Sequence, residues 1–269
     1  MDYLTFLETE LKKAAETAGD YFGKAKSSIK ADRSVLTEAD LAISKHLVAA
    51  VQKTYPNYNI IDEEAGVIDK GSQYTWVIDS IDGTSNFAAG VPTYGIMMGL
   101  LKDETPIAGG FVVPPTNELY VAEKGRGTTL NGNRIFVTQE SELRNCLVAY
   151  HVQKKQDDDE FTRNEAKIIG EVVLEIRELR SSGSEPIDVG YVACGKYGAR
   201  LNQYGKIWDC VAPQIIVEEA GGIFTDFWGK PQDYSDALNK TKLNYTVCAA
   251  APQLHKQLQA IIHKNSVIS

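Results

Sequence analysis

The 269-residue sequence lacks several features that mark common classes of protein. It has no apolar run near the roughly 18 residues of a transmembrane helix, and no basic start followed by an apolar core, so we expect neither membrane association nor a secretion signal. Its four cysteines lack Cys-x-x-Cys spacing, and its four histidines lack the spacing of a metal site. These absences disfavour zinc and redox chemistry, and scattered reduced cysteines are typical of a cytoplasmic protein.

Positive charge is also scarce. The chain has 28 Lys and Arg residues against 36 Asp and Glu residues, which gives a net charge of −8. A nucleic-acid backbone favours a basic protein face, so we do not expect nucleic acid as a partner. Surface residues explain most of the acidic excess, and the remainder fits a site that binds cations.

Hydrophobic periodicity divides the chain into two halves. Residues 2–23 have the apolar spacing of an amphipathic helix, and a second helix begins at Thr37. Short apolar runs separated by turn residues then predict an antiparallel sheet in the N-terminal half, residues 1–145. Strands and helices alternate in residues 146–269. We expect the two halves to form one compact unit.

The most informative stretch is WVIDSIDGTSNF, at residues 76–87. Its first three residues are apolar and β-rich, so they predict a buried strand that ends near Asp79 and Asp82. Gly83 permits a sharp turn, and either of the two hydroxyl residues after it can cap a following helix. Carboxylates can hold a hard cation, and the free N–H groups of a helix start can receive a phosphate. The stretch therefore predicts a magnesium-dependent phosphatase.

Two further acids, Glu63 and Asp209, also lie at the ends of expected elements. If these acids converge with Asp79 and Asp82, each close pair of carboxylates costs about 4 kcal/mol at an effective dielectric constant near 20. Such a cluster needs cations at neutral pH, and ligands that are all oxygen favour Mg²⁺ over zinc. Asp40 has a simpler local interpretation, because with Thr37 it resembles a helix capping box.

Three motifs make nearly the whole chain resemble the inositol monophosphatase family. They are IDEE at residues 61–64, the stretch at 76–87, and WDCVA at 208–212 followed by EAGG at 219–222. The resemblance implies a layered α/β/α/β/α sandwich of the inositol monophosphatase and fructose-1,6-bisphosphatase type. It also implies a lithium-sensitive homodimer that hydrolyses a small phosphorylated metabolite, with an inositol phosphate as the leading substrate.

The resemblance implies a role for each matching residue. Glu63, Asp79 and the Ile81 carbonyl would hold a first Mg²⁺, and Asp79, Asp82 and Asp209 a second, while a third and looser ion would contact Glu63. Thr84, oriented by Asp40, would activate the attacking water together with Glu63. The substrate contacts would come from Asp82, Gly83, Thr84, Ser85, Gly183, Ser184, Glu185, Asn202 and Asp209. Residues 24–36 would form a mobile loop over the site, with Lys30 as its contact.

Three positions depart from the family pattern. Ser80 stands where the family usually has proline, which affects the stiffness of the loop more than the chemistry. Asn202 stands where the inositol enzymes carry a glutamate that binds sugar hydroxyls, and Glu185 where a small residue is common. Histidinol phosphate, fructose-1,6-bisphosphate and 3′-phosphoadenosine 5′-phosphate therefore stay open as alternative substrates.

Two other functional classes are open at this stage. A haloacid-dehalogenase-type phosphatase uses an Asp-x-Asp-Gly-Thr motif with an aspartyl nucleophile. Here Asp79 and Asp82 are one residue further apart and lie deep in the chain, which counts against that class. A non-catalytic cation-binding module would keep the metal acids without the residues that activate water, but Thr84 and Asp40 are both present.

Overall fold

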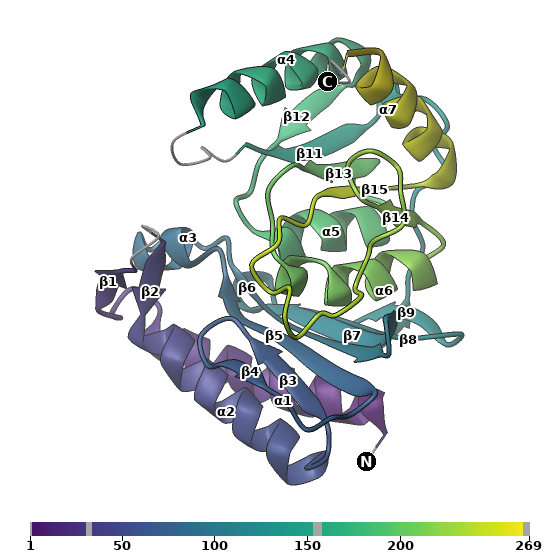
Figure 1. Cartoon of the computed structure of the whole chain (residues 1–269). Coiled ribbons are helices and arrows are strands. Elements are labelled where there is room, and N and C mark those ends of the chain that lie inside the picture. Colours follow the sequence, from purple (N-terminus) through teal and green to yellow (C-terminus); the bar gives the residue numbers. More distant parts are fainter. Residues whose placement is uncertain (1, 31–33, 153–157, 266–269) are drawn as a thin grey trace.

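Helices and sheets alternate in layers through the molecule (Figure 1). The computed structural model describes residues 2–30, 34–152 and 158–265. Its helices are α1 (Tyr3–Tyr21), α2 (Glu38–Thr54), α3 (Thr84–Ala88), α4 (Asp159–Glu175), α5 (Glu185–Ala193), α6 (Val211–Glu219) and α7 (Pro252–Asn265). Short 3-10 turns form at η1 (Pro114–Thr116), η2 (Leu143–Asn145) and η3 (Ile207–Asp209). None of these helices is long and apolar enough to cross a membrane.

The strands of the described residues form one hairpin and two larger sheets. The hairpin pairs β1 (Ser27–Ile29) with β2 (Val35–Thr37). The eight-stranded sheet contains β3 (Asn59–Asp62), β4 (Gly66–Ile68), β5 (Tyr74–Asp82), β6 (Gly95–Lys102), β7 (Thr105–Val113), β8 (Glu118–Glu123), β9 (Gly127–Leu130) and β10 (Asn133–Arg134). The five-stranded sheet contains β11 (Leu147–His151), β12 (Glu178–Arg180), β13 (Ala199–Asn202), β14 (Ile223–Thr225) and β15 (Val247–Ala250).

The layers follow from which helix faces are apolar. In α1, Leu7, Leu11, Ala14 and Ala18 recur at helical spacing and are fully buried, so this face packs on the eight-stranded sheet beside α2. Helices α5 and α6 lie between the two larger sheets, and α4 and α7 cover the outer face of the five-stranded sheet (Figure 1). The predicted α/β/α/β/α sandwich is therefore confirmed.

The order of the eight-stranded sheet is β10-β9-β8-β7-β6-β5-β3-β4, and its pairs are antiparallel except for β3 and β5. The prediction of a wholly antiparallel sheet is therefore wrong at this one pair. Because β3 and β5 are parallel, both run toward the same edge of the sheet, and Asp62 pairs with Ile78. Glu63, directly after β3, consequently lies at the same edge as the acids that end β5.

Two local predictions need correction. The turn after β5 is capped by neither Thr84 nor Ser85, because Gly83 is the N-cap of α3, with a φ of 84°, and no side chain accepts a capping hydrogen bond. A Cβ atom at Gly83 would lie 2.9 Å from the Thr93 carbonyl oxygen, so the turn requires glycine. The apolar spacing of Val211, Ile215 and Val217 predicts one continuous helix from about Ile207 to Ala220, whereas the structure forms the 3-10 turn η3 followed by α6.

The expected mobile loop at residues 24–36 contains the β1–β2 hairpin, and its residues 31–33 lie outside the described part of the chain. The division into halves at residues 1–145 and 146–269 stays a prediction about folding units. The strands of the eight-stranded sheet come from residues 59–134, and those of the five-stranded sheet from residues 147–250. Helix α6 packs on strands of both sheets, which joins the halves through one shared layer.

The close approach of α6 to the eight-stranded sheet predicts that Gly99→Ala is destabilising. A Cβ atom at Gly99 would lie 2.6 Å from Val211 Cγ1 and 2.7 Å from the Ala212 backbone nitrogen. We expect a loss of about 1–3 kcal/mol in the free energy of unfolding, measured by urea denaturation. Gly170→Ala in α4 is the control, since its Cβ would meet nothing within 4 Å and the change favours helix by up to about 1 kcal/mol. Equal stability of the two variants would contradict the packing argument.

Candidate active site

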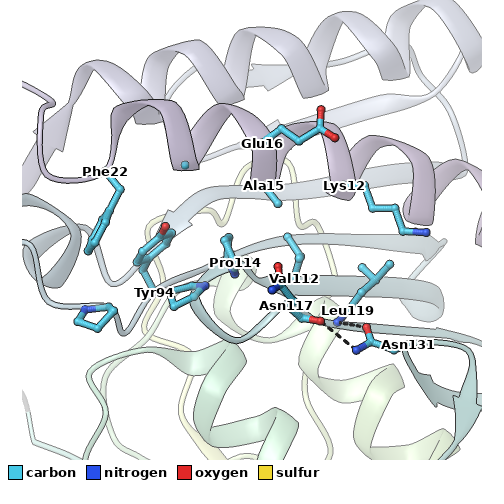
Figure 2. A pocket seen from close by; sticks show the side chains of 13 residues that line it. Lys12, Ala15, Glu16, Phe22, Tyr94, Val112, Pro114, Asn117, Leu119 and Asn131 are labelled. Atoms are coloured by element: carbon cyan, nitrogen blue, oxygen red, sulfur yellow. Dashed lines mark hydrogen bonds between the residues drawn. The ribbon is translucent and has the colours of Figure 1, made fainter.

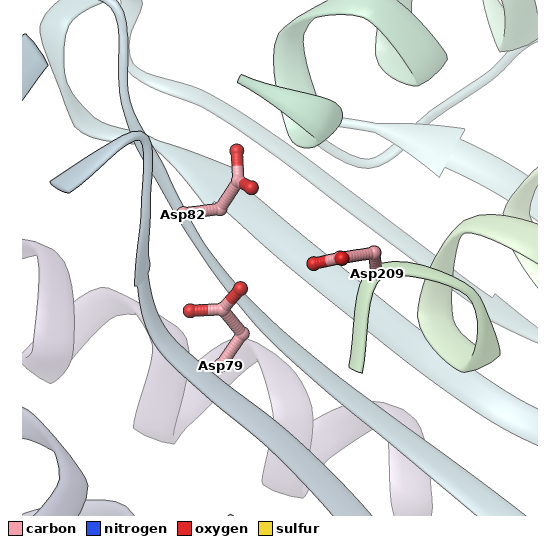
Figure 3. Close-up of side chains that lie close together, drawn as sticks. All are labelled: Asp79, Asp82 and Asp209. Carbon is pink, nitrogen blue, oxygen red and sulfur yellow. The ribbon is translucent and has the colours of Figure 1, made fainter. Parts of the chain in front are cut away.

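Three aspartates meet where the two halves of the chain come together. Asp79 and Asp82 lie at the end of β5, and Asp209 ends η3, which precedes α6. Figure 3 shows the three carboxylates pointing toward one another from these separate segments. One ligand oxygen from each lies within 4.8 Å of the others. Of the four acids that the sequence places at ends of elements, these are the three that form this group.

Burial makes this cluster electrostatically costly when it holds no cation. Asp79 is only 2% exposed, and its Oδ1 has no hydrogen-bond partner among the described residues. Burial first, and then the charges of neighbouring acids, raise the pKa values of Asp79 and Asp209 well above their usual range. Burial and the nearby Glu185 raise the pKa of Asp82 to about 7. A buried, unpaired carboxylate oxygen beside two other carboxylates fits an oxygen-ligated divalent cation such as Mg²⁺.

Glu63 lies beside this cluster but is held by a lysine. Lys30 Nζ, next to the β1–β2 hairpin, is 3.2 Å from Glu63 Oε1 and 2.6 Å from Glu64 Oε1. Burial raises the pKa of Glu63, while Lys30 opposes that rise. Asp62 supports the turn, because its Oδ1 accepts hydrogen bonds from Ser44 Oγ and from two backbone N–H groups of the next residues.

Asp40 contacts both a helix terminus and the candidate water-activating residue. Its Oδ2 accepts hydrogen bonds from the backbone N–H and the hydroxyl of Thr37, which completes the predicted capping box of α2. Its other oxygen, Oδ1, lies 3.3 Å from Thr84 Oγ1. The single hydrogen of the Thr84 hydroxyl has a second possible acceptor, the Ile81 carbonyl oxygen at 2.8 Å, so these two hydrogen bonds are alternatives. Burial raises the pKa of Asp40, and its hydrogen bonds with Thr37 act against this rise.

The candidate substrate residues lie around a cavity of about 40 Å³ next to the aspartates. Its lining consists of Asp82, His151, Gly183, Ser184, Glu185, Arg200, Asn202 and Asp209. The two halves are joined here, because the Glu185 backbone N–H donates to Asp82 Oδ1 at 2.6 Å. Asn86 Nδ2 adds hydrogen bonds to the carbonyl oxygens of Ser182 and Gly183 at 3.0 and 3.3 Å. Gly83, Thr84 and Ser85, in contrast, do not line the cavity, and Ser85 is exposed on α3.

Sequence reasoning missed two residues of this cavity, His151 and Arg200. His151 ends β11, and burial and the Arg200 charge lower its pKa to about 4, so it is neutral near pH 7. Arg200 is 2% exposed and bonds Glu185 Oε2 through two of its nitrogens. The one available signal was an arginine inside an otherwise apolar strand pattern at residues 199–201.

A larger cavity of about 680 Å³ lies away from the acids, between α1 and the eight-stranded sheet (Figure 2). Its described lining is mostly apolar, with Phe22, Tyr94 and Pro114 among its residues, and its charged members are Lys12 and Glu16. These two charges are of opposite sign and belong to one helix, α1. This larger cavity therefore lacks the group of acids that lines the smaller one.

The fold and this site define a class: layered α/β/α/β/α proteins with a buried cluster of carboxylates where the two larger sheets approach each other. Within it, the chain belongs to the inositol monophosphatase family, whose family model matches residues 1–266. It is 31% identical over 241 residues to an Aquifex aeolicus protein named fructose-1,6-bisphosphatase/inositol-1-monophosphatase, covering 87% of this chain and 90% of that protein.

Two further relatives extend the comparison. The chain is 30% identical over 264 residues to the Nus factor SuhB of Vibrio cholerae, covering 94% of each protein. The structure of an inositol monophosphatase from Thermotoga maritima matches with a TM-score of 0.85 and 27% identity, covering 98% of each chain. Because relatives named Nus factor are among those found, the comparisons do not support the expectation that nucleic acid is excluded as a partner.

The raised pKa of Asp82 predicts that the metal-free protein loses stability as pH rises. The folded state holds a proton on Asp82 up to about pH 7, whereas the unfolded chain releases it near the usual value of 3.8. The unfolded state therefore binds fewer protons between about pH 4 and pH 7, so this contribution to the free energy of unfolding falls across that window. Asp82→Asn removes this pH-dependent contribution. We therefore expect the free energy of unfolding of the variant, measured relative to the parent, to be about 1–3 kcal/mol more favourable at pH 8 than at pH 4.

This prediction is checked by urea denaturation at a series of pH values in a chelating buffer. Asp20→Asn, on the exposed side of α1, is the matched control and should follow the parent at every pH. If the Asp82→Asn and parent curves stayed parallel from pH 4 to 8, the carboxylate would not be destabilised by its surroundings.

Proposed function

We propose that this protein hydrolyses a small phosphate monoester with the help of Mg²⁺, and that an inositol phosphate is the leading substrate. The observation that carries the proposal is the convergence of Asp79, Asp82 and Asp209 beside the Asp40–Thr84 pair. Membership of the inositol monophosphatase family supports phosphatase chemistry. The relative named fructose-1,6-bisphosphatase/inositol-1-monophosphatase supports the substrate class.

The proposed metal ligands are oxygen atoms only. Asp79, Asp82 and Asp209 would supply carboxylates from the cluster. Glu63, whose charge acts on Asp79, and the Ile81 carbonyl oxygen are the further candidate ligands. We propose that they hold two to three Mg²⁺ ions. When bound, Mg²⁺ supplies a water of lowered pKa and positive charge that stabilises the leaving oxygen of a phosphate ester.

The side chains of Thr84 and Asp40 are suited to remove a proton from the attacking water. The Thr84 hydroxyl oxygen can accept a hydrogen bond from the water, while the hydroxyl hydrogen is donated to Asp40 Oδ1, which lies 3.3 Å away. Because Thr37 occupies only Oδ2 of Asp40, the second oxygen is free for this function. A raised pKa makes Asp40 a better proton acceptor than an exposed aspartate.

The phosphate would lie at the sharp turn that begins α3. The backbone N–H groups of Gly83, Thr84 and Ser85 start this helix, and they are the candidate donors to the phosphate oxygens. The leaving alcohol would then face the cavity formed by Gly183, Ser184, Glu185 and Asn202. Asn202 is restrained there, since its Oδ1 accepts a hydrogen bond from the Tyr204 backbone N–H at 3.0 Å.

Histidinol phosphate, fructose-1,6-bisphosphate and 3′-phosphoadenosine 5′-phosphate are the alternative substrates for the same chemistry. A panel of these esters and inositol 1-phosphate, assayed by the release of free phosphate, ranks them by their rates of hydrolysis. We also propose that the protein is a homodimer, which light scattering measures. A phospho-aspartyl adduct trapped on Asp79 would instead favour the haloacid-dehalogenase mechanism.

Asp209→Asn tests the metal assignment. We expect phosphate release in Mg²⁺ buffer to fall by more than about a hundredfold, because the variant loses one anionic ligand of the cluster. The thermal unfolding midpoint of the metal-free protein should not decrease, since a buried charge has been removed. Full activity in this variant would refute the metal assignment.

Thr84→Ala separates catalysis from cation binding. The variant should still bind Mg²⁺ in calorimetry, but its rate of phosphate release should fall by about a hundredfold or more, because the proton acceptor chain is broken. Thr17→Ala, on the exposed side of α1, is the control and should retain activity. A protein that binds Mg²⁺ but hydrolyses no ester in its parent form would be a cation-binding module instead.

Lithium inhibition tests the family's cation preference in this chain. We expect Li⁺ to inhibit phosphate release at roughly sub-millimolar to millimolar concentrations, because a small hard cation competes for oxygen ligands arranged for Mg²⁺. Potassium chloride at equal ionic strength is the control. Insensitivity to Li⁺ would contradict the lithium sensitivity that the family resemblance implies, without removing the metal chemistry.

A further inference from the structure

A buried ion cluster lies directly behind the candidate active site. Arg200, on β13, is 2% exposed, and its Nε and Nη2 lie 3.1 and 2.7 Å from Glu185 Oε2. Asp188, one turn further along α5, is fully buried with Oδ2 at 3.7 Å from Arg200 Nε. One guanidinium therefore faces two carboxylates, so the cluster carries a net negative charge when both carboxylates are ionised.

Arg200 engages only one of the two oxygens of Glu185. Both short bonds from the guanidinium end on Oε2, while Oε1 is buried and has no hydrogen-bond partner among the described residues. The Glu185 side chain is 3% exposed and lines the 40 Å³ cavity with Asp82 and Asp209. A buried acceptor without a donor is costly, unless a ligand supplies the donor.

The backbone fixes this acceptor relative to the reacting centre. The Glu185 N–H donates to Asp82 Oδ1 at 2.6 Å, so the residue that bears the unpaired oxygen is bonded to a candidate metal ligand. Helix α5 begins at Glu185, and Pro186 follows in its first turn, which limits the freedom of this segment. A group on the leaving alcohol close to the ester oxygen would therefore meet Glu185.

We infer that Glu185, held by Arg200, selects substrates whose leaving alcohol carries a hydrogen-bond donor close to the ester oxygen. The inference rests on the proposed phosphatase function and specifies the substrate class of the same site. A hydroxyl or an ammonium group would donate to the unpaired oxygen of Glu185. A carboxylate or second phosphate at that position would meet the net negative charge of the cluster and be repelled.

A matched series of two-carbon esters tests the selection. Ethyl phosphate has no donor, 2-hydroxyethyl phosphate adds a hydroxyl, 2-aminoethyl phosphate adds an ammonium, and carboxymethyl phosphate adds a carboxylate. We expect kcat/KM of the parent protein in Mg²⁺ buffer to be at least about tenfold higher for the hydroxyl or ammonium ester than for the ethyl ester. The carboxylate ester should be the poorest substrate. A difference between the two favoured esters identifies which donor the site prefers.

Glu185→Gln keeps the shape of the side chain and removes its charge, while Asp188 still faces Arg200. The variant should lose most of the preference for donor-bearing esters, with the largest loss for the ammonium ester. Glu185→Asp keeps the charge on a shorter side chain. Its preference in kcat/KM for donor-bearing esters should therefore lie between that of Glu185→Gln and that of the parent. Asp188→Asn is the matched control, since it removes a carboxylate from the same arginine without lining the cavity. Its preference for the hydroxyl and ammonium esters over ethyl phosphate should stay within about twofold of the parent, whereas its discrimination against the carboxylate ester, which depends on the charge of the cluster, should weaken.

Binding supplies a second readout that does not depend on turnover. The phosphonate analogue of each ester cannot be hydrolysed, and calorimetry should give the same order of affinities and the same loss in Glu185→Gln. The inference is overturned if Glu185→Gln lowers kcat/KM for all four esters by one common factor, or if the parent protein prefers the carboxylate ester. If the parent hydrolyses none of the esters or the inositol phosphate, the proposed function itself fails, and this inference fails with it.

Discussion

Repulsion among buried carboxylates is the constraint on which the site depends. Asp79, Asp82 and Asp209 have ligand oxygens within 4.8 Å of one another, and Asp79 is buried while the other two are partly buried. At an effective dielectric constant near 20, each close pair of such charges costs about 4 kcal/mol. Proteins rarely collect acids in this way without a compensating charge, so either protons or cations must neutralise them. The raised pKa values of the three aspartates favour neutralisation by protons, whereas the proposed Mg²⁺ ions would neutralise the same carboxylates as cations.

The layered fold makes this arrangement possible because it draws the acids from distant segments. The parallel pairing of β3 with β5 places Glu63 beside the end of β5, and the layer of α5 and α6 brings in Asp209 from the C-terminal half. Neither half contains the whole cluster. The hydrogen bond from the Glu185 N–H to Asp82 then fixes the two halves relative to each other at the reacting centre.

Local patterns were sufficient to predict much of this architecture. Helix α1, the capping box at Thr37 and Asp40, and the buried strand before Asp79 follow from spacing and capping chemistry within a few residues. The parallel β3–β5 pair did not follow, because strand direction depends on contacts between segments rather than on either segment alone. The same reason explains why Arg200 was missed, since its partners Glu185 and Asp188 lie on another element.

Lys30, next to the β1–β2 hairpin, supplies a positive charge to two further acids. Its ammonium group contacts Glu63 and Glu64, and so places one positive charge beside the acids that follow β3. An ammonium is a weaker counter-charge than a divalent ion, because it carries half the charge and cannot accept several oxygens at metal–ligand distance. A cation bound by Glu63 would therefore compete with Lys30 for the same carboxylate.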